Sequence, residues 1–338
     1  MKNTNGLLTI KNLVKHFDIS GGLVDQLAIE NRRIIRRRTT VKALNDVSLS
    51  IMPRETLGVV GESGCGKSTL ARAVLGLYPP TSGEIYYQTK RIDNMNPQQM
   101  LPYRKRMQMI FQDPYASLNP RMTVKSTLEE PVYFHKKSIT SQKAGEKVAE
   151  VMQQVGVDPK WAGRYPHEFS GGQRQRISIA RALMVDPEFI VADEPVSALD
   201  VSIQAQILNL LMEAQEKRGL TYLFITHDLS VVKHISTRVA VMYLGTICEL
   251  ARTKEIFESP RHPYTQALLS AIPELGRQKS KHVKLKGEVP TPINLPSGCV
   301  FHGRCNYINE RCARETPKLI RLSSGAQVAC HGVEEGRL

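Results

Sequence analysis

The stretch Gly61-Glu62-Ser63-Gly64-Cys65-Gly66-Lys67-Ser68 has the residue types of a phosphate-binding loop. It follows an apolar run at 57–60 and precedes a helix-like stretch from Thr69 to Leu77. Glycines let backbone N–H groups close around phosphate oxygens, and the N-terminus of the next helix attracts anions. Lys67 adds a compact positive charge, and Ser68 adds an oxygen ligand for Mg²⁺. The sequence therefore predicts a nucleotide-binding site here. We expect no chemical role for the Cys65 thiol.

Two acidic residues, Asp193 and Glu194, directly follow the apolar run Phe189 to Ala192. The carboxyl end of a buried strand opens into the crevice of an α/β sheet, where nucleotides bind. There Asp193 can hold Mg²⁺, and Glu194 can accept a proton from an attacking water or orient it. The pair predicts hydrolysis of the bound nucleotide.

Two further polar residues also follow strand-like runs. His227 comes after the run 222–226 and can donate a hydrogen bond to the terminal phosphate. Gln112 comes after Met109-Ile110-Phe111, and its amide can touch both metal and water. Because Gln112 stands where a helical stretch begins, it is suited to sense the nucleotide state.

These residues need a sheet to bring them together, and the chain alternates strand and helix patterns as such a sheet requires. Strand patterns cover residues 7–17, 41–51, 84–87, 189–192, 222–225 and 239–244, and helix patterns cover residues 144–155, 177–184, 203–218 and 229–235. This alternation is typical of an α/β protein with a doubly wound parallel sheet. Beyond about residue 250 the chain becomes proline-rich and basic, so we expect the core to end there.

Two stretches interrupt the alternation. Residues 113–166 contain Pro114, Pro120 and Pro131 and then a helical apolar spacing, which predicts a helical subdomain inserted into the sheet domain. Residues 18–40 contain a glycine pair and five arginines: Arg32, Arg33, Arg36, Arg37 and Arg38. We interpret this basic insertion as a solvated loop; a contact with anionic lipid or with a partner subunit is the alternative.

A second anion site is predicted at Phe169 to Arg176, just before a helix pattern. Two phosphate sites in one chain suggest that they meet across a dimer interface. The phosphate loop, Gln112, Ser170 to Gln173, Asp193-Glu194, Ser197 to Asp200 and His227 occur in an order and spacing that resembles the ATP-binding cassette (ABC) ATPases. The resemblance covers residues 7 to about 250.

The resemblance implies a RecA-like ATPase core with an antiparallel β subdomain and an inserted helical subdomain at about 113–177, within an ABC domain at 1–250. The implied ATP contacts are Phe17 on the adenine, Gly61, Ser63, Gly64, Cys65, Gly66, Lys67, Ser68, Thr69, Gln112 and His227. The implied contacts to ATP on a partner subunit are Ser170, Gly171, Gly172, Gln173 and Asp200. Glu194, His227 and Gln112 are the implied catalytic residues, and Ser68, Gln112 and Asp193 the implied Mg²⁺ ligands.

Three further segments narrow the resemblance to ATP-binding subunits of oligopeptide and dipeptide importers, most like the second, F-type, subunit. These segments are 111–120, 261–269 and a tail with four cysteines. The family implies a heterodimer with a second ABC ATPase subunit, two transmembrane permease subunits and an extracytoplasmic peptide-binding protein. It also implies a peripheral location on the cytoplasmic face of the inner (plasma) membrane.

The tail, within a C-terminal extension at 251–338, carries Cys299, Cys305, Cys312 and Cys330 in a loop-rich stretch at 296–331. Four soft ligands in a segment with few apolar residues are typical of a metal centre, because ligation substitutes for a core. Zinc, an iron–sulfur cluster and unligated thiols all remain open on spacing alone. Similar tails in peptide-importer ATPases favour a [4Fe–4S] cluster, with Zn²⁺ as the alternative.

Length, charge and apolar content limit the other classes of protein to which the chain could belong. The chain has 338 residues and a net charge of +14, and it has no apolar run long enough to span a membrane. The charge invites an alternative function, a soluble cassette ATPase acting on nucleic acid or ribosomes. Against it, only one cassette is present and no aromatic-studded basic strip appears, so we expect no nucleic-acid partner. A GTPase is disfavoured because no Asn-Lys-x-Asp motif occurs.

Overall fold

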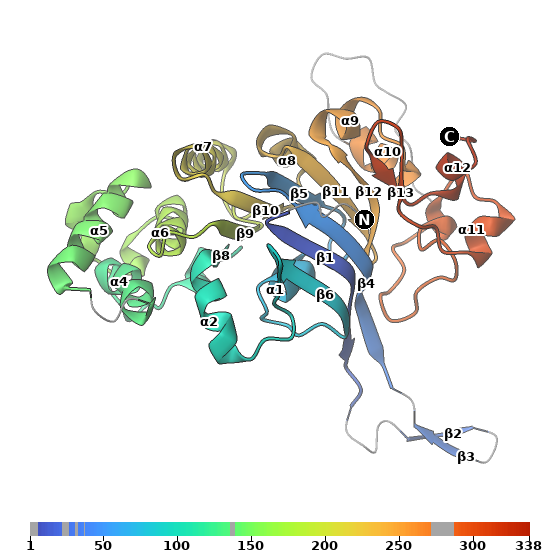
Figure 1. The fold of residues 1–338 in the computed structure, drawn as a ribbon, viewed down its shortest axis with the longest axis horizontal. Coiled ribbons are helices and arrows are strands. Elements are labelled where there is room, and N and C mark those ends of the chain that lie inside the picture. The colour runs from blue at the N-terminus through green and yellow to red at the C-terminus, as the bar shows by residue number, and fades with distance from the viewer. Residues whose placement is uncertain (1–5, 22–26, 31–32, 37, 136–138, 272–286) are drawn as a thin grey trace. The chain divides into compact units, whose positions relative to one another are not determined.

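A computed structural model describes residues 6–21, 27–30, 33–36, 38–135, 139–271 and 287–338 (Figure 1). The chain divides into two compact units. The first comprises residues 1–50, 59–94 and 227–338, and the second comprises residues 51–58 and 95–226.

The first unit contains an antiparallel sheet with the strand order β4-β1-β6-β7. Its strands are β1 (Leu8–Asp18), β4 (Thr40–Ile51), β6 (Ser82–Tyr87) and β7 (Lys90–Arg91). Strand β1 pairs with β6 from Leu8 opposite Tyr87 to Val14 opposite Ser82. The apolar residues Leu8, Ile10 and Leu13 are at most 2% exposed, so the alternating pattern does mark a half-buried strand.

The basic insertion is not simply a loop. It contains the antiparallel strands β2 (Leu27–Glu30) and β3 (Arg33–Arg36), with Leu27 opposite Arg36 and Glu30 opposite Arg33. Runs of four residues are too short to show a period among charged neighbours, which is why the pattern was missed. Residues 22–26, 31–32 and 37 of the insertion lie outside the described residues.

A second group of strands in the first unit follows the order β13-β14-β12-β11. The strands are β11 (Arg238–Tyr243), β12 (Thr246–Arg252), β13 (Ile320–Arg321) and β14 (Gln327–Val328). These pair antiparallel, so the predicted parallel sheet does not extend to this edge. The cause is the two-residue turn Leu244-Gly245, where φ is 42° and 77°, because positive φ at both positions favours a tight hairpin.

The helices of the first unit are mostly short. They are α1 (Lys67–Val74), α8 (Leu229–Ile235), α9 (Thr253–Glu258), α10 (Pro263–Ser270), η3 (His302–Arg304), α11 (Glu310–Arg314) and α12 (His331–Glu334). Strand β5 (Thr56–Val60) enters the phosphate loop, and its residues divide between the two units.

The second unit contains the parallel part of the predicted sheet. Strands β8 (Met107–Ile110), β9 (Phe189–Asp193) and β10 (Thr221–Ile225) pair in parallel, with Phe189 opposite both Met107 and Thr221. Every residue of β9 and β10 is buried. Strands that are covered on both faces read as continuous apolar runs, as these do.

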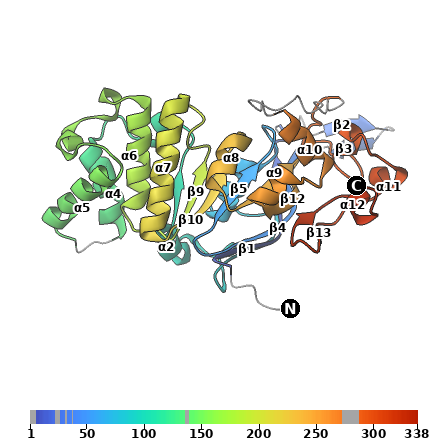
Figure 2. The ribbon, with the colours of Figure 1, turned by 90° about the horizontal axis from the view of Figure 1, so that it is seen from above.

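Helices make up most of the remainder of the second unit, and Figure 2 shows α4 to α7 lying together. They are α2 (Pro97–Arg106), α3 (Pro114–Ser117), α4 (Val124–His135), α5 (Ser141–Gln154), η1 (Pro159–Gly163), η2 (Pro166–Glu168), α6 (Gly171–Leu183) and α7 (Val201–Arg218). The predicted helical stretch after Gln112 is therefore present. Within the described ranges, none of the helices has the length and apolar character needed to cross a membrane.

Candidate functional site

The phosphate loop joins β5 to α1, as the residue pattern predicts. Gly66 precedes the helix with φ at 104°, and a Cβ there would lie 2.3 Å from the Ala43 carbonyl oxygen, so this position requires glycine. The Lys67 ammonium donates to the carbonyl oxygens of Gly61 (2.8 Å) and Glu62 (3.0 Å). The lysine charge is thereby held against the loop backbone, where phosphates would bind.

Cys65 contributes backbone rather than thiol chemistry to the loop. Its side chain is 2% exposed, and its carbonyl oxygen accepts a hydrogen bond from the Gly245 N–H at 2.9 Å. Burial raises the pKa of the Cys65 thiol, and the nearby Lys67 offsets this only in part. The thiol is therefore neutral at physiological pH.

The structure brings together two of the predicted catalytic residues. Gln112 follows β8, Glu194 follows β9, and the Gln112 Nε2 donates to Glu194 Oε2 at 3.1 Å. Glu194 has a φ of 48°, a left-handed conformation that is rare for glutamate and typical of functional sites. The Glu194 N–H donates to the Ile225 carbonyl at 2.9 Å, which ties this backbone to β10.

The other predicted contacts of ATP and Mg²⁺ lie at strand ends. Asp193 is 3% exposed at the end of β9, and His227 is exposed after β10. Phe17 is half-buried near the end of β1, with its ring edge-on to Tyr78 at 5.3 Å and the Lys15 ammonium 4.8 Å from its centroid. Its predicted adenine contact stays a prediction.

The residues expected to contact ATP on a partner subunit, Ser170 to Gln173, are called the signature residues below. They lie at the start of α6, whereas the pattern predicted a stretch before a helix at 177–184. Ser170 is the N-cap: its Oγ accepts from the Gln173 N–H at 3.4 Å, and Gln173 Oε1 accepts from the Ser170 N–H at 3.0 Å. This reciprocal capping box uses two polar side chains to start the helix. Gly171 and Gly172 form the first turn, where free N–H groups favour anions.

Asp200 caps α7. Its Oδ1 accepts from the Ile203 N–H at 3.0 Å and from the Ser202 hydroxyl at 2.7 Å. These hydrogen bonds, the Ile203 N–H first, lower the pKa of the Asp200 carboxyl. The carboxylate is therefore charged and oriented at the exposed start of the helix.

The four C-terminal cysteines lie near one another without forming a metal-ligand group. Burial, with smaller contributions from Cys312, Cys330 and Cys305, raises the pKa of Cys299 to about 12. The Cys299 N–H also donates to the Cys312 carbonyl at 2.8 Å. Four thiols suit a soft metal in kind. However, within the ranges that the structure describes, no three His, Cys, Asp or Glu side chains are arranged to hold a metal ion.

The segment 261–264 connects the C-terminal region to the core. The buried Glu249 carboxylate on β12 accepts from the backbone N–H groups of Arg261 (2.8 Å) and His262 (2.9 Å). His262 Nδ1 accepts from the Tyr264 N–H at 3.0 Å and so caps α10. Pro263 occupies the first helical position, where its missing N–H costs nothing. This proline starts a helix, so the core does not end at residue 250 as expected.

The buried imidazole of His262 should make the protein less stable in mild acid. Burial lowers the pKa of His262 to about 4, below the ordinary value of about 6.5. As the pH falls from about 6.5 to about 4, the unfolded chain takes up a proton that the folded chain excludes. Stability present above pH 6.5 is therefore lost across this window. From pH 7 to pH 5 we expect about 2 kcal/mol of loss from this group.

Urea unfolding of the wild-type protein and of His262→Asn, each at pH 7 and at pH 5, measures this loss of folding stability. Asparagine can accept the Tyr264 N–H but does not titrate, so the variant should lose about 2 kcal/mol less between pH 7 and pH 5. Equal losses in the two proteins would show that His262 does not carry the effect.

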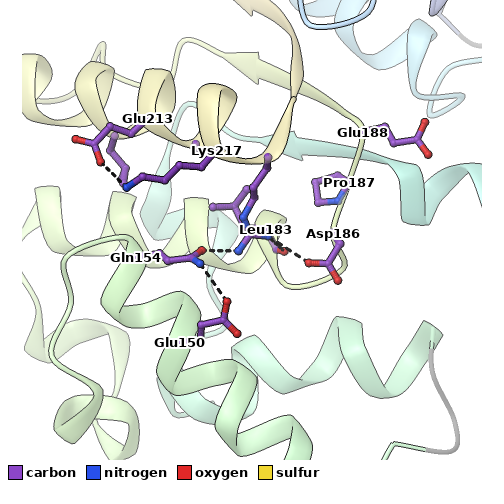
Figure 3. A pocket seen from close by; sticks show the side chains of 11 residues that line it. Glu150, Gln154, Leu183, Asp186, Pro187, Glu188, Glu213 and Lys217 are labelled. Carbon is purple, nitrogen blue, oxygen red and sulfur yellow. Dashed lines mark hydrogen bonds and ion pairs between the residues drawn. The ribbon is translucent and has the colours of Figure 1, made fainter.

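A hollow in the second unit lies among α5, α7 and the turn after α6 (Figure 3). Its charges are paired: Asp186 with Arg218 at 3.2 Å, and Glu213 with Lys217 at 3.2 Å. Gln154 donates to Glu150 at 3.1 Å. The Asp186–Arg218 pair joins the turn after α6 to α7, whereas the other two contacts lie within α7 and within α5. We assign this hollow no chemistry.

Sequence reasoning missed three residues that meet at the phosphate loop: Glu62, Arg304 and Tyr264. Glu62 lies inside the loop but had no predicted role, and its carboxylate pairs with Arg304 at 2.7 Å. The Glu62 N–H donates to the Tyr264 hydroxyl at 3.0 Å. Neither Arg304 nor Tyr264 has a local pattern that points to residue 62.

Two family models match the chain. The ABC transporter model matches residues 44–197, and the model of the oligopeptide/dipeptide transporter C-terminal region matches residues 248–312. The chain is 50% identical over 333 residues to the oligopeptide transport ATP-binding protein AppF of Bacillus subtilis, covering 97% of this chain and 98% of the relative. It is 49% identical over 316 residues to the oligopeptide transport ATP-binding protein OppF of Escherichia coli, covering 93% and 92%.

Solved structures of similar proteins include a dimeric post-hydrolysis state of the ATP-binding cassette MJ0796 bound to ADP and Pi. It has 27% identity and a TM-score of 0.63, and the match covers 73% of this chain and 98% of that one. The cassette cbiO1 of Clostridium perfringens, part of the ABC transporter complex cbiONQ, has 25% identity and a TM-score of 0.63, covering 75% and 92%.

Proposed function

Since the chain belongs to the ABC transporter family, among the ATP-binding subunits of oligopeptide and dipeptide transporters, it is an ATPase, and we propose that its ATP hydrolysis powers peptide uptake. The peptide assignment rests on one observation: the similarity to peptide transporters is not limited to the cassette but includes residues 248–312. The alternative, a cassette that works on nucleic acid or ribosomes, has only the net charge of +14 in its favour.

The phosphate loop holds the ATP phosphates in this proposal, through its backbone N–H groups and Lys67. Ser68, Gln112 and Asp193 would hold Mg²⁺, since hydroxyl, amide and carboxylate oxygens are the donors that it prefers. When bound, Mg²⁺ neutralises charge on the phosphates. Glu194 orients the attacking water and accepts its proton, and the hydrogen bond from Gln112 at 3.1 Å supports this role by fixing one carboxylate oxygen. His227 would donate to the terminal phosphate.

The signature residues act on ATP held by a second cassette subunit. The capping box at Ser170 and Gln173 supports this, because it fixes a helix N-terminus that carries two glycines. Asp200 would line the same contact, and the two ATPase subunits would close around two Mg·ATP.

The chain would work as a peripheral subunit on the cytoplasmic face of the plasma membrane, under two permease subunits that receive peptide from an extracytoplasmic binding protein. Exposed aromatic side chains on the helices after Gln112 support a permease contact: Tyr115 and Phe134 are each 63% exposed. A hollow of about 500 Å³ lies beside Tyr115 and is lined partly by Asn119, Pro120 and Arg181.

A metal centre on the four cysteines is a separate proposal, a [4Fe–4S] cluster before Zn²⁺. Its support is the presence of four soft donors in one short segment. Iron and zinc analysis with an absorbance spectrum on anaerobically purified protein tests it. Finding neither metal in stoichiometric amount would rule out the centre.

Uptake of a labelled oligopeptide by cells that lack this chain tests the function. Uptake should fall to background, return with the wild-type chain and stay absent with Lys67→Ala. Unchanged uptake in the deleted strain, together with salt-sensitive RNA binding by the purified chain, would favour the nucleic-acid function instead.

A further inference from the structure

The C-terminal segment reaches the phosphate loop through one arginine. Arg304 ends the short helix η3, which lies between Cys299 and Cys305. Its Nη1 donates to Glu62 Oε2 at 2.7 Å, and its Nη2 donates to Glu62 Oε1 at 3.1 Å. Two parallel bonds between a guanidinium and a carboxylate fix orientation as well as distance. The partners are 242 residues apart in the chain, so only the folded protein makes this contact.

A second contact holds the backbone of the same loop residue. The Glu62 N–H donates to the Tyr264 hydroxyl at 3.0 Å, and Tyr264 is fully buried at the start of α10. Glu62 is therefore held through its main chain by one C-terminal residue and through its side chain by another.

The support for both contacts is a packed aromatic cluster of Tyr243, Tyr264 and Phe301, all at most 2% exposed. The Tyr243 ring lies 4.7 Å from that of Tyr264 and 5.3 Å from that of Phe301, centroid to centroid. The Phe301 carbonyl accepts from the Arg304 N–H at 3.0 Å. The Arg304 side chain is only 10% exposed. Close packing leaves such a side chain few alternative rotamers.

Glu62 is also in direct contact with Lys67, so fixing the position of Glu62 helps to fix that of the lysine. The Glu62 carbonyl oxygen accepts from the Lys67 ammonium at 3.0 Å. Charge matters as well as position, because an unpaired carboxylate inside a phosphate-binding loop would repel the phosphates. Arg304 supplies the neutralising charge, so the loop can carry a glutamate and still bind an anion.

We propose that Arg304 is a positioning residue for ATP: it neutralises Glu62 and, with Tyr264, fixes the phosphate loop, so that the C-terminal segment sets ATP affinity. This inference rests on the proposed assignment of the loop to ATP. Arg304 acts through Glu62 and takes no part in hydrolysis itself.

The test is ATP binding and hydrolysis by the full chain with Arg304→Gln. Loss of a charge-assisted pair that is partly exposed at Glu62 should raise the Kd and the KM for ATP roughly 3- to 10-fold. The kcat at saturating ATP should change less than about 2-fold, because hydrolysis uses other residues. An unchanged Kd in a folded Arg304→Gln protein would overturn the proposal.

The double variant Glu62→Gln/Arg304→Gln separates neutralisation of the Glu62 charge from a merely structural role. Once residue 62 is uncharged, the repulsion is gone, so the ATP Kd should return to within about 2-fold of wild type. A structural defect in the C-terminal segment would not be repaired by a change in the loop, so failure of this recovery would also contradict the proposal. If Arg304→Gln does not fold, Arg304→Lys takes its place, since it keeps the charge but loses the fork, and we expect a Kd about 2- to 3-fold above wild type.

Arg311→Gln is the matched control. It is the same change in the same segment, but Arg311 pairs with Glu315, Glu334 and Glu335. We expect no change in its ATP Kd; a rise equal to that of Arg304→Gln would assign the effect to general loosening of the segment.

Lys67→Ala separates the assignment of the loop to ATP from the role of Arg304. Retained ATP binding in Lys67→Ala would refute the assignment of the loop itself, whereas loss there with an unchanged Arg304→Gln would refute only the role of Arg304.

Discussion

Replacing Glu194 by glutamine should stop ATP turnover while ATP binding persists. A glutamine keeps an oxygen that accepts the hydrogen bond from Gln112, now 3.1 Å from Glu194, so the local geometry should survive. It cannot take the proton from an attacking water. Loss of a general base costs about 100-fold or more in rate. The measurements are steady-state phosphate release and retention of labelled ATP by the assembled protein.

Glu188→Gln is the matched control for this prediction. Glu188 lies just before β9, whereas Glu194 lies just after it, and its carboxylate forms an exposed pair with Arg106 at 2.7 Å. Exposed pairs contribute little to stability, so the hydrolysis rate should be unchanged. If Glu194→Gln hydrolyses ATP at the rate of Glu188→Gln, the assignment of Glu194 as the base is wrong.

The sequence predicts the strands that precede two of the candidate hydrolytic residues, Glu194 and His227, because both strands are fully buried. The runs before Asp193 and His227 are apolar on both faces, and these are β9 and β10. Such strands can be recognised without knowing which strands lie beside them, because burial on both faces requires a continuous apolar run. The contact between Gln112 and Glu194 then follows from the parallel pairing of β8 with β9.

Helix boundaries depend on capping, which apolar periodicity does not show. The helix pattern begins at Ile177, but α6 begins at Gly171 because Ser170 and Gln173 cap each other. The spacing of serine and glutamine three residues apart was legible in the sequence. In the same way Pro263, which indicated an end of the core, is the first residue of α10.

Contacts across long stretches of chain have no local signal. Glu62 and Arg304 are 242 residues apart, and each is an ordinary charged residue among others in its own segment. The packing of Tyr243, Tyr264 and Phe301 supports η3 beside the loop. Tertiary packing of this kind fixes which of the 46 basic residues meets Glu62.

Replacing Gly171 by glutamate should stop hydrolysis in the assembled transporter and leave the fold intact. A Cβ at Gly171 would meet only Leu199 Cδ2, at 3.7 Å, which is an ordinary contact. At Gly172 the added Cβ would lie 2.6 Å from Ile203 Cγ2, so that position cannot separate function from folding. Position 171 is therefore the one to change.

The physical reason for the expected loss is charge at the start of α6. In the proposed dimer this helix N-terminus faces the phosphates of ATP on the second subunit, and a carboxylate there replaces attraction by repulsion. We expect hydrolysis to fall roughly 100-fold, the range seen when a donor to a developing negative charge is lost. ATP binding to the chain's own phosphate loop should be unchanged, because Gly171 acts on the other subunit's nucleotide.

Gly163→Glu controls for the added charge, since a Cβ at Gly163 has no atom within 4 Å. Phosphate release by the assembled two-cassette complex and ATP binding by the isolated chain should be measured for both variants. The position-171 variant should lose hydrolysis only, and the position-163 variant should lose neither. Hydrolysis at the wild-type rate in Gly171→Glu would exclude a role for the α6 N-terminus in the partner's ATP site. Loss of ATP binding by the isolated chain would instead place Gly171 at its own nucleotide, and the two cassettes would not share their sites.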